Sequence, residues 1–312
     1  MLAFAHILAR AFESEASRLP TGKGFDMPFE MTVSTDNWRP DWWPIGKILK
    51  RIAALDEKYV ELTTQTGFNL LEGLGFSPYV SVDDDPYMMR DLLQQHGLQL
   101  KSIDCGYPIW SVHSVEVLCK TIPWGDMLSG CKIYVVTDSG EYPPGRSKQE
   151  WYDIIKYHME LVIPVAERHG AVVAIEPHGW LTTEPESLLR LASQNKSKCI
   201  GINFDTGNSF IAGQDPARFV DLVKDYIVHM HIKDVSAELS AAMRGEETGI
   251  ASSEAYVGSG VNAENIKKCL DIMERTGRVI PISPEAAGDK LMPQSIRWVR
   301  DYLKSKGYRV TP

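Results

Sequence analysis

The fold is decided by the stretch Val172-Val173-Ala174-Ile175-Glu176-Pro177-His178-Gly179. Four apolar residues are followed abruptly by a carboxylate, a proline, an imidazole and a glycine, which predicts a buried strand that ends at the rim of a sheet. Three later stretches have the same design, namely 200–205, 227–231 and 279–285. Because a packed core rarely places ionisable groups at the ends of its most apolar strands, we interpret the four strand ends as one site.

Eight strands can be placed along the chain, with helical periodicity between them. The strands are expected near residues 29–35, 59–64, 98–104, 132–137, 172–176, 199–205, 227–231 and 279–283, and clear helices at 45–54, 87–95, 149–169, 185–194, 216–224, 262–275 and 293–306. Eight successive strand-helix units are typical of a parallel (β/α)8 barrel, a TIM barrel, whose chemistry lies at the carboxyl ends of the strands. We predict one catalytic barrel domain over residues 29–312.

Residues 1–28 are expected to form an N-terminal extension. Its first twelve residues could form an amphipathic helix with Phe4, Ile7, Leu8, Ala11 and Phe12 toward one side, or they could be a frayed terminus.

Charge and composition argue against several classes of protein. The chain has 33 Lys and Arg against 41 Asp and Glu, and its formal charge of -8 disfavours nucleic acid and anionic membranes as partners. No run approaches the ~20 apolar residues of a membrane helix. The five cysteines include no close-spaced pair, which favours free thiols in a reducing cytoplasm.

The four strand ends carry residues that can bind a metal. Glu176, Asp205, His231 and Glu285 follow one another at intervals of 29, 26 and 54 residues (205 − 176, 231 − 205, 285 − 231), which places them on adjacent strands of the barrel. Three carboxylates and one imidazole favour Mn²⁺, Mg²⁺ or Co²⁺ over a closed structural zinc site. We therefore expect one divalent ion, which would also relieve the repulsion between the carboxylates.

A general base is expected beside this ion. A metal of this kind can hold the oxygens of a hydroxyketone and stabilise the enediolate that forms when the adjacent carbon loses a proton. His178 is the first candidate, because it lies on the same side of an extended chain as Glu176 and its imidazole titrates near neutrality. Glu176 and Glu285 are its competitors.

Further residues near the strand ends are candidates for substrate contact: Trp38, Gln65, Asn208, Lys233 and Arg244. Lys233 could orient His231 or the substrate, or it could form a surface ion pair with Asp234. A cup of carboxylates with aromatic walls suits a sugar, although the same rings could simply close the mouth of the barrel. Gly258 and Gly260 could cradle an anion before a helix, or form a plain turn.

These motifs resemble a known family. Ile-Glu-Pro-His-Gly at 175–179, Asn-Phe-Asp-Thr-Gly-Asn at 203–208, His-Met-His-Ile-Lys-Asp at 229–234, Gly-Ser-Gly at 258–260 and Glu285 are similar to the sugar phosphate isomerase/epimerase superfamily of xylose isomerase-like barrels. The resemblance spans roughly residues 29–306. It implies that Glu176, Asp205, His231 and Glu285 bind one divalent ion, often manganese.

Two kinds of reaction stay open within the superfamily. Asn208 stands where ketose 3-epimerases usually have a histidine, and the His-Ile-Lys-Asp form is closer to inosose dehydratase-like lyases. Segments 241–251 and 260–263 are similar to the catalytic α subunit of bacterial C-glycoside deglycosidases. That resemblance implies a 3-oxo-glycoside substrate, His178 as the base, release of the aglycone and a small β-subunit partner. A sugar isomerase or epimerase is the alternative.

Two other classes fit the sequence less well. A nuclease of the endonuclease IV type would need more clustered histidines and a basic groove, whereas the eight histidines here are scattered and the charge is negative. A catalytically silent scaffold would not need four aligned ligands.

Overall fold

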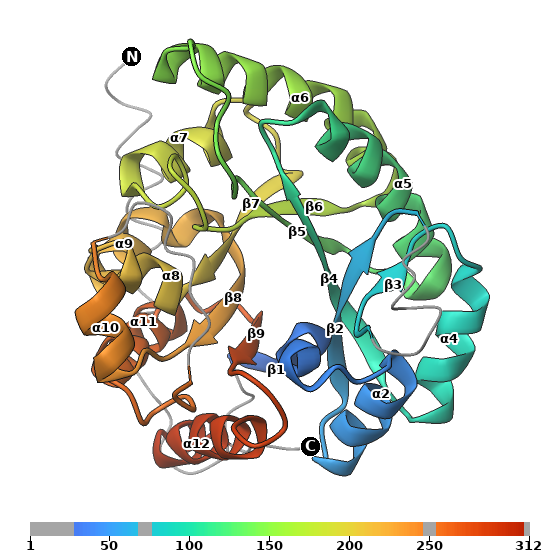
Figure 1. Cartoon of the computed structure of the whole chain (residues 1–312), viewed down its shortest axis with the longest axis vertical. Coiled ribbons are helices and arrows are strands. Elements are labelled where there is room, and N and C mark those ends of the chain that lie inside the picture. Colours follow the sequence, from blue (N-terminus) through green and yellow to red (C-terminus); the bar gives the residue numbers. More distant parts are fainter. Residues whose placement is uncertain (1–27, 68–76, 246–253, 309–312) are drawn as a thin grey trace, which may run out of the picture.

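The computed structural model describes residues 28–67, 77–245 and 254–308, in which eight parallel strands close into a barrel. The strand order is β1-β9-β8-β7-β6-β5-β4-β2, and β1 pairs with β2 to complete the ring (Figure 1). The strands are β1 (Phe29–Ser34), β2 (Tyr59–Gln65), β4 (Gln99–Pro108), β5 (Ile133–Thr137), β6 (Val172–Ile175), β7 (Ile200–Asp205), β8 (Ile227–Lys233) and β9 (Ile280–Glu285). A two-residue strand, β3 (Val80–Ser81), pairs with the end of β2.

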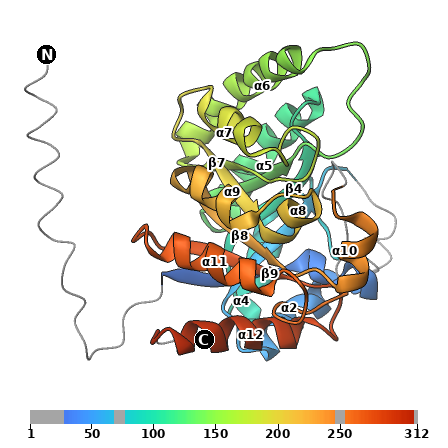
Figure 2. The same cartoon turned by 90° about the vertical axis from the view of Figure 1, so that its left-hand side faces the viewer.

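Helices surround this barrel, and Figure 2 shows α7, α9, α11 and α12 along one side of it. The helices are α2 (Ile45–Ala54), α4 (Pro86–Gln95), α5 (Val112–Ser129), α6 (Lys148–His169), α7 (Pro185–Ser193), α8 (Thr206–Ile211), α9 (Pro216–Val223), α10 (Ala237–Met243), α11 (Ala263–Glu274) and α12 (Met292–Ser305), with short 3-10 helices η1 (Thr35–Asp41) and η2 (Lys224–Tyr226). The eight-stranded barrel predicted from the sequence is confirmed.

Local sequence signals explain where α6 begins and ends. Ser147 and Glu150 form a capping box, in which each side chain binds the backbone N–H of the other residue. The helix ends at Gly170, whose φ of 60° is the left-handed conformation that glycine adopts easily. These two caps define the first and last residues of the long helix that connects β5 to β6.

Helix α5 was not among the clear helices that the sequence predicts. It contains Pro123 and Gly125, and exposed apolar residues such as Val112 and Met127 obscure the stripe of its buried residues. Gly125 allows close packing, because a Cβ there would lie 2.6 Å from the Tyr134 hydroxyl oxygen. Tertiary packing, rather than periodicity, stabilises this helix.

The barrel interior contains polar side chains below its carboxyl end. Glu61, Ser102, Asn203 and His229 are all fully buried, at 0% exposure. Ser102 on β4 contacts His229 on β8, and because these two strands are not neighbours the contact crosses the interior. The apolar core fills the layer between the sheet and the helices, where Phe204 packs edge-on against Phe219.

Some predicted features cannot be placed. The N-terminal residues Phe4 to Phe12, and residues 246–251 of the segment resembling a deglycosidase, lie outside the described residues. Among the residues that are described, no helix is long and apolar enough to cross a membrane.

Candidate functional site

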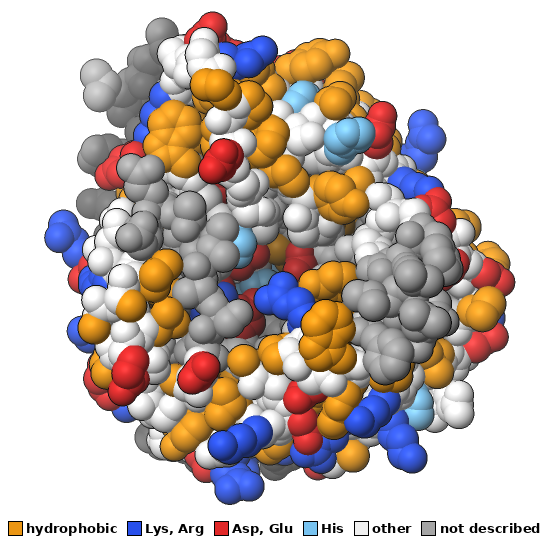
Figure 3. All heavy atoms as spheres, viewed as in Figure 1, with side chains coloured by type: hydrophobic (Ala, Val, Ile, Leu, Met, Phe, Trp, Pro, Cys, Tyr) orange, Lys and Arg blue, Asp and Glu red, His pale blue; other side chains and the backbone are white. Residues whose placement is uncertain are grey.

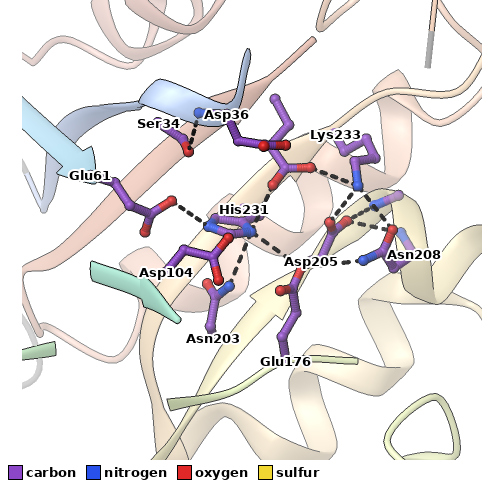
Figure 4. A network of polar contacts seen from close by, with 12 residues as sticks. Ser34, Asp36, Glu61, Asp104, Glu176, Asn203, Asp205, Asn208, His231 and Lys233 are labelled. Carbon is purple, nitrogen blue, oxygen red and sulfur yellow. Dashed lines mark hydrogen bonds and ion pairs between the residues drawn. The ribbon is translucent and has the colours of Figure 1, made fainter. Parts of the chain in front are cut away.

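Four neighbouring strands deliver the predicted ligands to the carboxyl end of the barrel. Asp205 is paired in register with His231 on β8, while Glu176 directly follows β6 and Glu285 ends β9. One ligand atom from each of the four lies within 4.8 Å of every other. Figure 4 labels three of them, Glu176, Asp205 and His231. The structure thus brings the four residues together, as the spacing predicted.

Lys233 and Asn208 are part of this cluster. The Lys233 ammonium lies 3.0 Å from Asp205 Oδ2, 2.6 Å from Glu285 Oε2 and 2.9 Å from Asn208 Oδ1. The Asn208 amide donates to Glu176 Oε1 at 3.2 Å. Lys233 is therefore not a surface partner of Asp234. Asn208 is fully buried, hydrogen-bonds Glu176 and Lys233, and is not among the described residues that line the cup.

The donor set fits a divalent ion. It offers three carboxylates and one imidazole, an oxygen-rich set of the kind that hard divalent cations prefer. Burial raises the pKa of Glu176 to about 7 and also raises the pKa of Asp205, because a buried carboxylate loses the water that stabilises its charge. A bound cation would favour their ionised forms.

A second polar group lies beneath these ligands and was missed by the sequence analysis. His231 donates from Nε2 to Glu61 Oε1 at 2.9 Å, and Nδ1 of the same ring faces Glu285 Oε1 at 2.8 Å. Ser102 donates to the other oxygen of Glu61 at 2.7 Å. Although burial alone would raise it, the imidazoles of His231 and His229 lower the pKa of Glu61 to about 2. Glu61 thus orients the ring of a candidate ligand.

His178 reaches the cup on a loop that is fixed from below. The Asp138 carboxylate, fully buried after β5, accepts from the Leu181 N–H at 2.9 Å and from the Thr182 hydroxyl. The Thr182 hydroxyl oxygen accepts from the backbone N–H of His178 at 2.8 Å. Gly179 is required here, because a Cβ would clash with Asp138. The loop therefore has one defined path past the cup.

The imidazole of His178 is neutral and partly unpaired. Its Nδ1 is buried and makes no hydrogen bond to any described residue. Burial, followed by the Lys233 ammonium, lowers its pKa to about 4. Both oxygens of Glu285 contact His231 or Lys233, whereas Nδ1 of His178 has no such partner among the described residues.

The cup itself is a cavity of about 400 Å³, within the range of small-molecule sites. Acidic and histidine side chains lie at the bottom of the hollow in Figure 3. The residues that line it include Asp36, Arg39, Gln65, Tyr79, Asp104, Tyr107, Glu176, His178, Lys233 and Glu285. Gln65 is thus on the wall, as a substrate contact requires.

Trp38 and Arg244, two of the predicted substrate contacts, are not brought to the wall of the cup by the described part of the structure. Trp38 is fully buried, and its indole N–H donates to Asp289 at 3.1 Å. The guanidinium of Arg244 stacks over Phe210 and donates to backbone carbonyls that include that of Phe210. Neither side chain lines the cavity formed by the described residues.

The Gly258 to Gly260 turn binds an anionic group, which is the carboxylate of Asp234 in the same chain. The Asp234 carboxylate accepts from the N–H groups of Gly258, Gly260 and Asn262, each at 2.9 Å. A Cβ at Gly260 would clash with this carboxylate and with the Val235 carbonyl. The cradle therefore fixes the loop after β8.

Comparisons with known proteins agree with this fold. Residues 49–302 match the family described as "Xylose isomerase-like TIM barrel". The chain is 24% identical over 180 residues to an inosose dehydratase of Geobacillus kaustophilus, a match that covers 52% of this chain and 58% of the relative, so it spans little more than half of the relative's length.

Two solved structures show the shared fold. A D-tagatose 3-epimerase-like protein has a TM-score of 0.69 at 19% identity, covering 89% of this chain and 98% of that chain. The 3-keto-D-glucoside 4-epimerase from E. coli has a TM-score of 0.63 at 15% identity, covering 88% of this chain and 99% of that chain.

Proposed function

The chain belongs to the xylose isomerase-like TIM barrel family, and we propose that it is a divalent-metal-dependent enzyme that removes a proton next to the ketone of a keto-sugar. One observation carries this proposal. A neutral His178 with an unpaired, buried Nδ1 lines the same cavity as Glu176 and Glu285, two of the four candidate metal ligands. Proton abstraction next to a carbonyl needs this combination of a base and a nearby cation.

Each residue of the proposed site would have a distinct role in the reaction. Glu176, Asp205, His231 and Glu285 would hold the ion, manganese by family resemblance, with magnesium or cobalt as alternatives. When bound, the ion would stabilise negative charge on the substrate oxygens. His178 would take the proton from C2 of the sugar, and its low pKa keeps it in the basic form at neutral pH. Lys233 would keep Asp205 and Glu285 ionised.

We propose that the reaction is an elimination, in which the bond between C1 and the aglycone of a 3-oxo-C-glycoside breaks and the aglycone is released. Two similarities support this proposal. Segments 241–251 and 260–263 are similar to C-glycoside deglycosidases, and the chain is similar to a protein named as an inosose dehydratase, a name that denotes an elimination reaction. The E. coli structure is named for action on a 3-keto-D-glucoside, which supports the substrate class but also an epimerase alternative. A small β subunit is part of this proposal through the same resemblance.

The test is to incubate the Mn²⁺-loaded protein with a 3-oxo-C-glucoside in D₂O, with and without a candidate small subunit. Aglycone release and deuterium exchange at C2 are followed together. His178→Ala should abolish both signals, whereas His113→Ala, on an exposed histidine of α5, should leave them unchanged.

The outcomes separate the candidate reactions. Release of the aglycone establishes elimination, and exchange without release indicates an isomerase or epimerase. Absence of both signals, also with keto-inositols and ketoses as substrates, contradicts the proposal.

A further inference from the structure

Asp36 is an acidic residue of the cup that the metal cluster does not use. It lies on η1, directly after β1, and lines the cavity together with Arg39 and Tyr79. Its Oδ2 is 3.5 Å from the Arg39 guanidinium. Its Oδ1 is buried and accepts no hydrogen bond from any part of the chain that the structure describes.

The backbone of η1 is clamped to the strand end that carries Glu285. The Asn37 side chain donates to the carbonyl oxygens of Ser34 at 3.0 Å and Pro284 at 3.1 Å, and it accepts from the Ala286 N–H at 2.9 Å. Pro284 and Ala286 are the two neighbours of Glu285. Asp36, which precedes Asn37, is therefore held in a fixed place beside the candidate ligands, as Figure 4 shows.

Asp36 and His178 approach the cup from opposite sides. Asp36 follows β1 and His178 follows β6. In the closed order of the barrel, β6 is four strands from β1 in either direction. A substrate held between these two strand ends would therefore have His178 at one face and Asp36 at the other.

A purely structural role does not explain this arrangement. The contact with Arg39 is long, and 56% of the Arg39 side chain is exposed, so the pair contributes ~1 kcal/mol at most. Tyr79 also hydrogen-bonds the Asp36 carboxylate, but Oδ1 has no partner among the described residues. A buried carboxylate oxygen without a partner is costly, and such atoms call for a functional explanation. The unpaired oxygen of Asp36 lies where a bound substrate could satisfy it.

We propose that Asp36 is the second proton-transferring residue of this site and acts opposite His178. The inference rests on the proposed function and deepens it. His178 takes the C2 proton, and the electron pair of that C–H bond forms the enolate of the C3 ketone, a step that can reverse and exchange the C2 hydrogen. In the next step the C3 carbonyl re-forms, the enolate electrons form the C1–C2 double bond, and the bond from C1 to the aglycone breaks. The aglycone carbon keeps the electrons of the broken bond and takes the proton of the Asp36 carboxylic acid. Solvent then reprotonates Asp36 and takes the proton from His178, so both residues return to their starting states and no oxidant or reductant is needed.

The surroundings of Asp36 are suited to an acid. Burial raises its pKa, the Arg39 guanidinium opposes this rise, and the charge of Glu285 adds to it. The substitution Asp36→Asn keeps the size of the side chain, while Asp41→Asn on the same 3-10 helix is the matched control, because Asp41 does not line the cavity.

The experiment measures the two halves of the reaction separately in Mn²⁺-loaded protein. Asp36→Asn should keep C2 deuterium exchange within about threefold of the parent, whereas product formation should fall by ~100-fold or more, the usual contribution of a general acid. Asp41→Asn should retain both rates. Product formation by Asp36→Ala should recover in formate, which can replace the missing acid. Circular dichroism and melting curves establish that each variant is folded.

Different results contradict different statements. If Asp36→Asn forms product within threefold of the parent rate, or loses exchange and product equally, Asp36 is not the second acid. If the parent itself shows no exchange with any keto-sugar, the proposed function fails, and this inference fails with it.

Discussion

Glu61→Gln tests whether the buried layer beneath the ligands holds the site together. The substitution keeps the shape of the side chain and removes a charge that is fully buried between His231 and His229. The pKa of Glu61 is lowered from 4.5 to about 2. Since each tenfold change in an acid constant is about 1.4 kcal/mol, ionised Glu61 stabilises the fold by about 3 kcal/mol at neutral pH. This agrees with the ~3–5 kcal/mol typical of breaking a buried ion pair.

Thermal unfolding of the metal-free protein gives the first measurement. A loss of about 3 kcal/mol should lower the Tm by about 6 °C at pH 7. Because the folded-state pKa is lowered, the stabilisation is complete above the unfolded pKa of about 4.5 and is lost as the pH falls toward 2. The difference between the variant and the parent should therefore shrink below pH 4.5.

Metal affinity gives the second measurement. A carboxylate that orients a ligating imidazole usually contributes 10- to 100-fold in affinity, so calorimetric titration with Mn²⁺ should show a dissociation constant raised by ~10- to 100-fold. Glu30→Gln is the control, because Glu30 forms a partly exposed ion pair with Lys101 at the opposite end of the barrel. Equal Tm and equal Mn²⁺ affinity in Glu61→Gln and the parent would refute this reasoning.

Other predictions concern the base, its loop and the Asp234 turn. At saturating Mn²⁺, the acid limb of the pH profile of C2 exchange should lie below the ordinary imidazole value of 6.5, with activity rising as His178 loses its proton, because burial and Lys233 lower its pKa to about 4; a limb at 6.5 that does not move with Mn²⁺ concentration would contradict this expectation. Asp138→Asn weakens the bonds to Leu181 and Thr182, so exchange should fall ~10-fold or more while Mn²⁺ affinity, measured by calorimetry, stays unchanged. Gly260→Ala should lower the free energy of unfolding by ~2 kcal/mol or more in denaturant titrations, since its Cβ would clash with Asp234 and Val235; an unchanged midpoint would contradict the clash.

The sequence predicts the strands and the four ligand positions because each ligand ends an apolar run. In a parallel barrel all such ends meet at one face, so spacing alone brings Glu176, Asp205, His231 and Glu285 together. The same reasoning could not place Lys233. A lysine after a strand is usually solvated, and only the register of β8 with β9 shows that its ammonium lies between Asp205 and Glu285.

Aromatic residues near strand ends predict the wall of the cup less well than the ionisable residues predict the metal ligands. Trp38 follows β1 closely enough to face a substrate, but η1 turns the chain so that its ring packs into the core and its N–H reaches Asp289. That turn depends on Asn37 binding the distant Pro284 and Ala286, a contact between residues about 250 positions apart that no local pattern records. The same turn places Asp36 on the cup wall.

Glu61 shows what a closer interpretation of the sequence could have found. It stands inside the apolar run Tyr59-Val60-Glu61-Leu62, and in a closed barrel the outward side of such a strand is covered by helices. A carboxylate within that run can avoid the apolar layer only by pointing to the barrel axis, where it needs buried partners that can donate hydrogen bonds. His229 and His231 alternate on β8 and both face that axis. A lone acid in one strand and alternating histidines in another therefore predict a buried ion pair beneath a metal site, even though the sequence does not show which strands face each other.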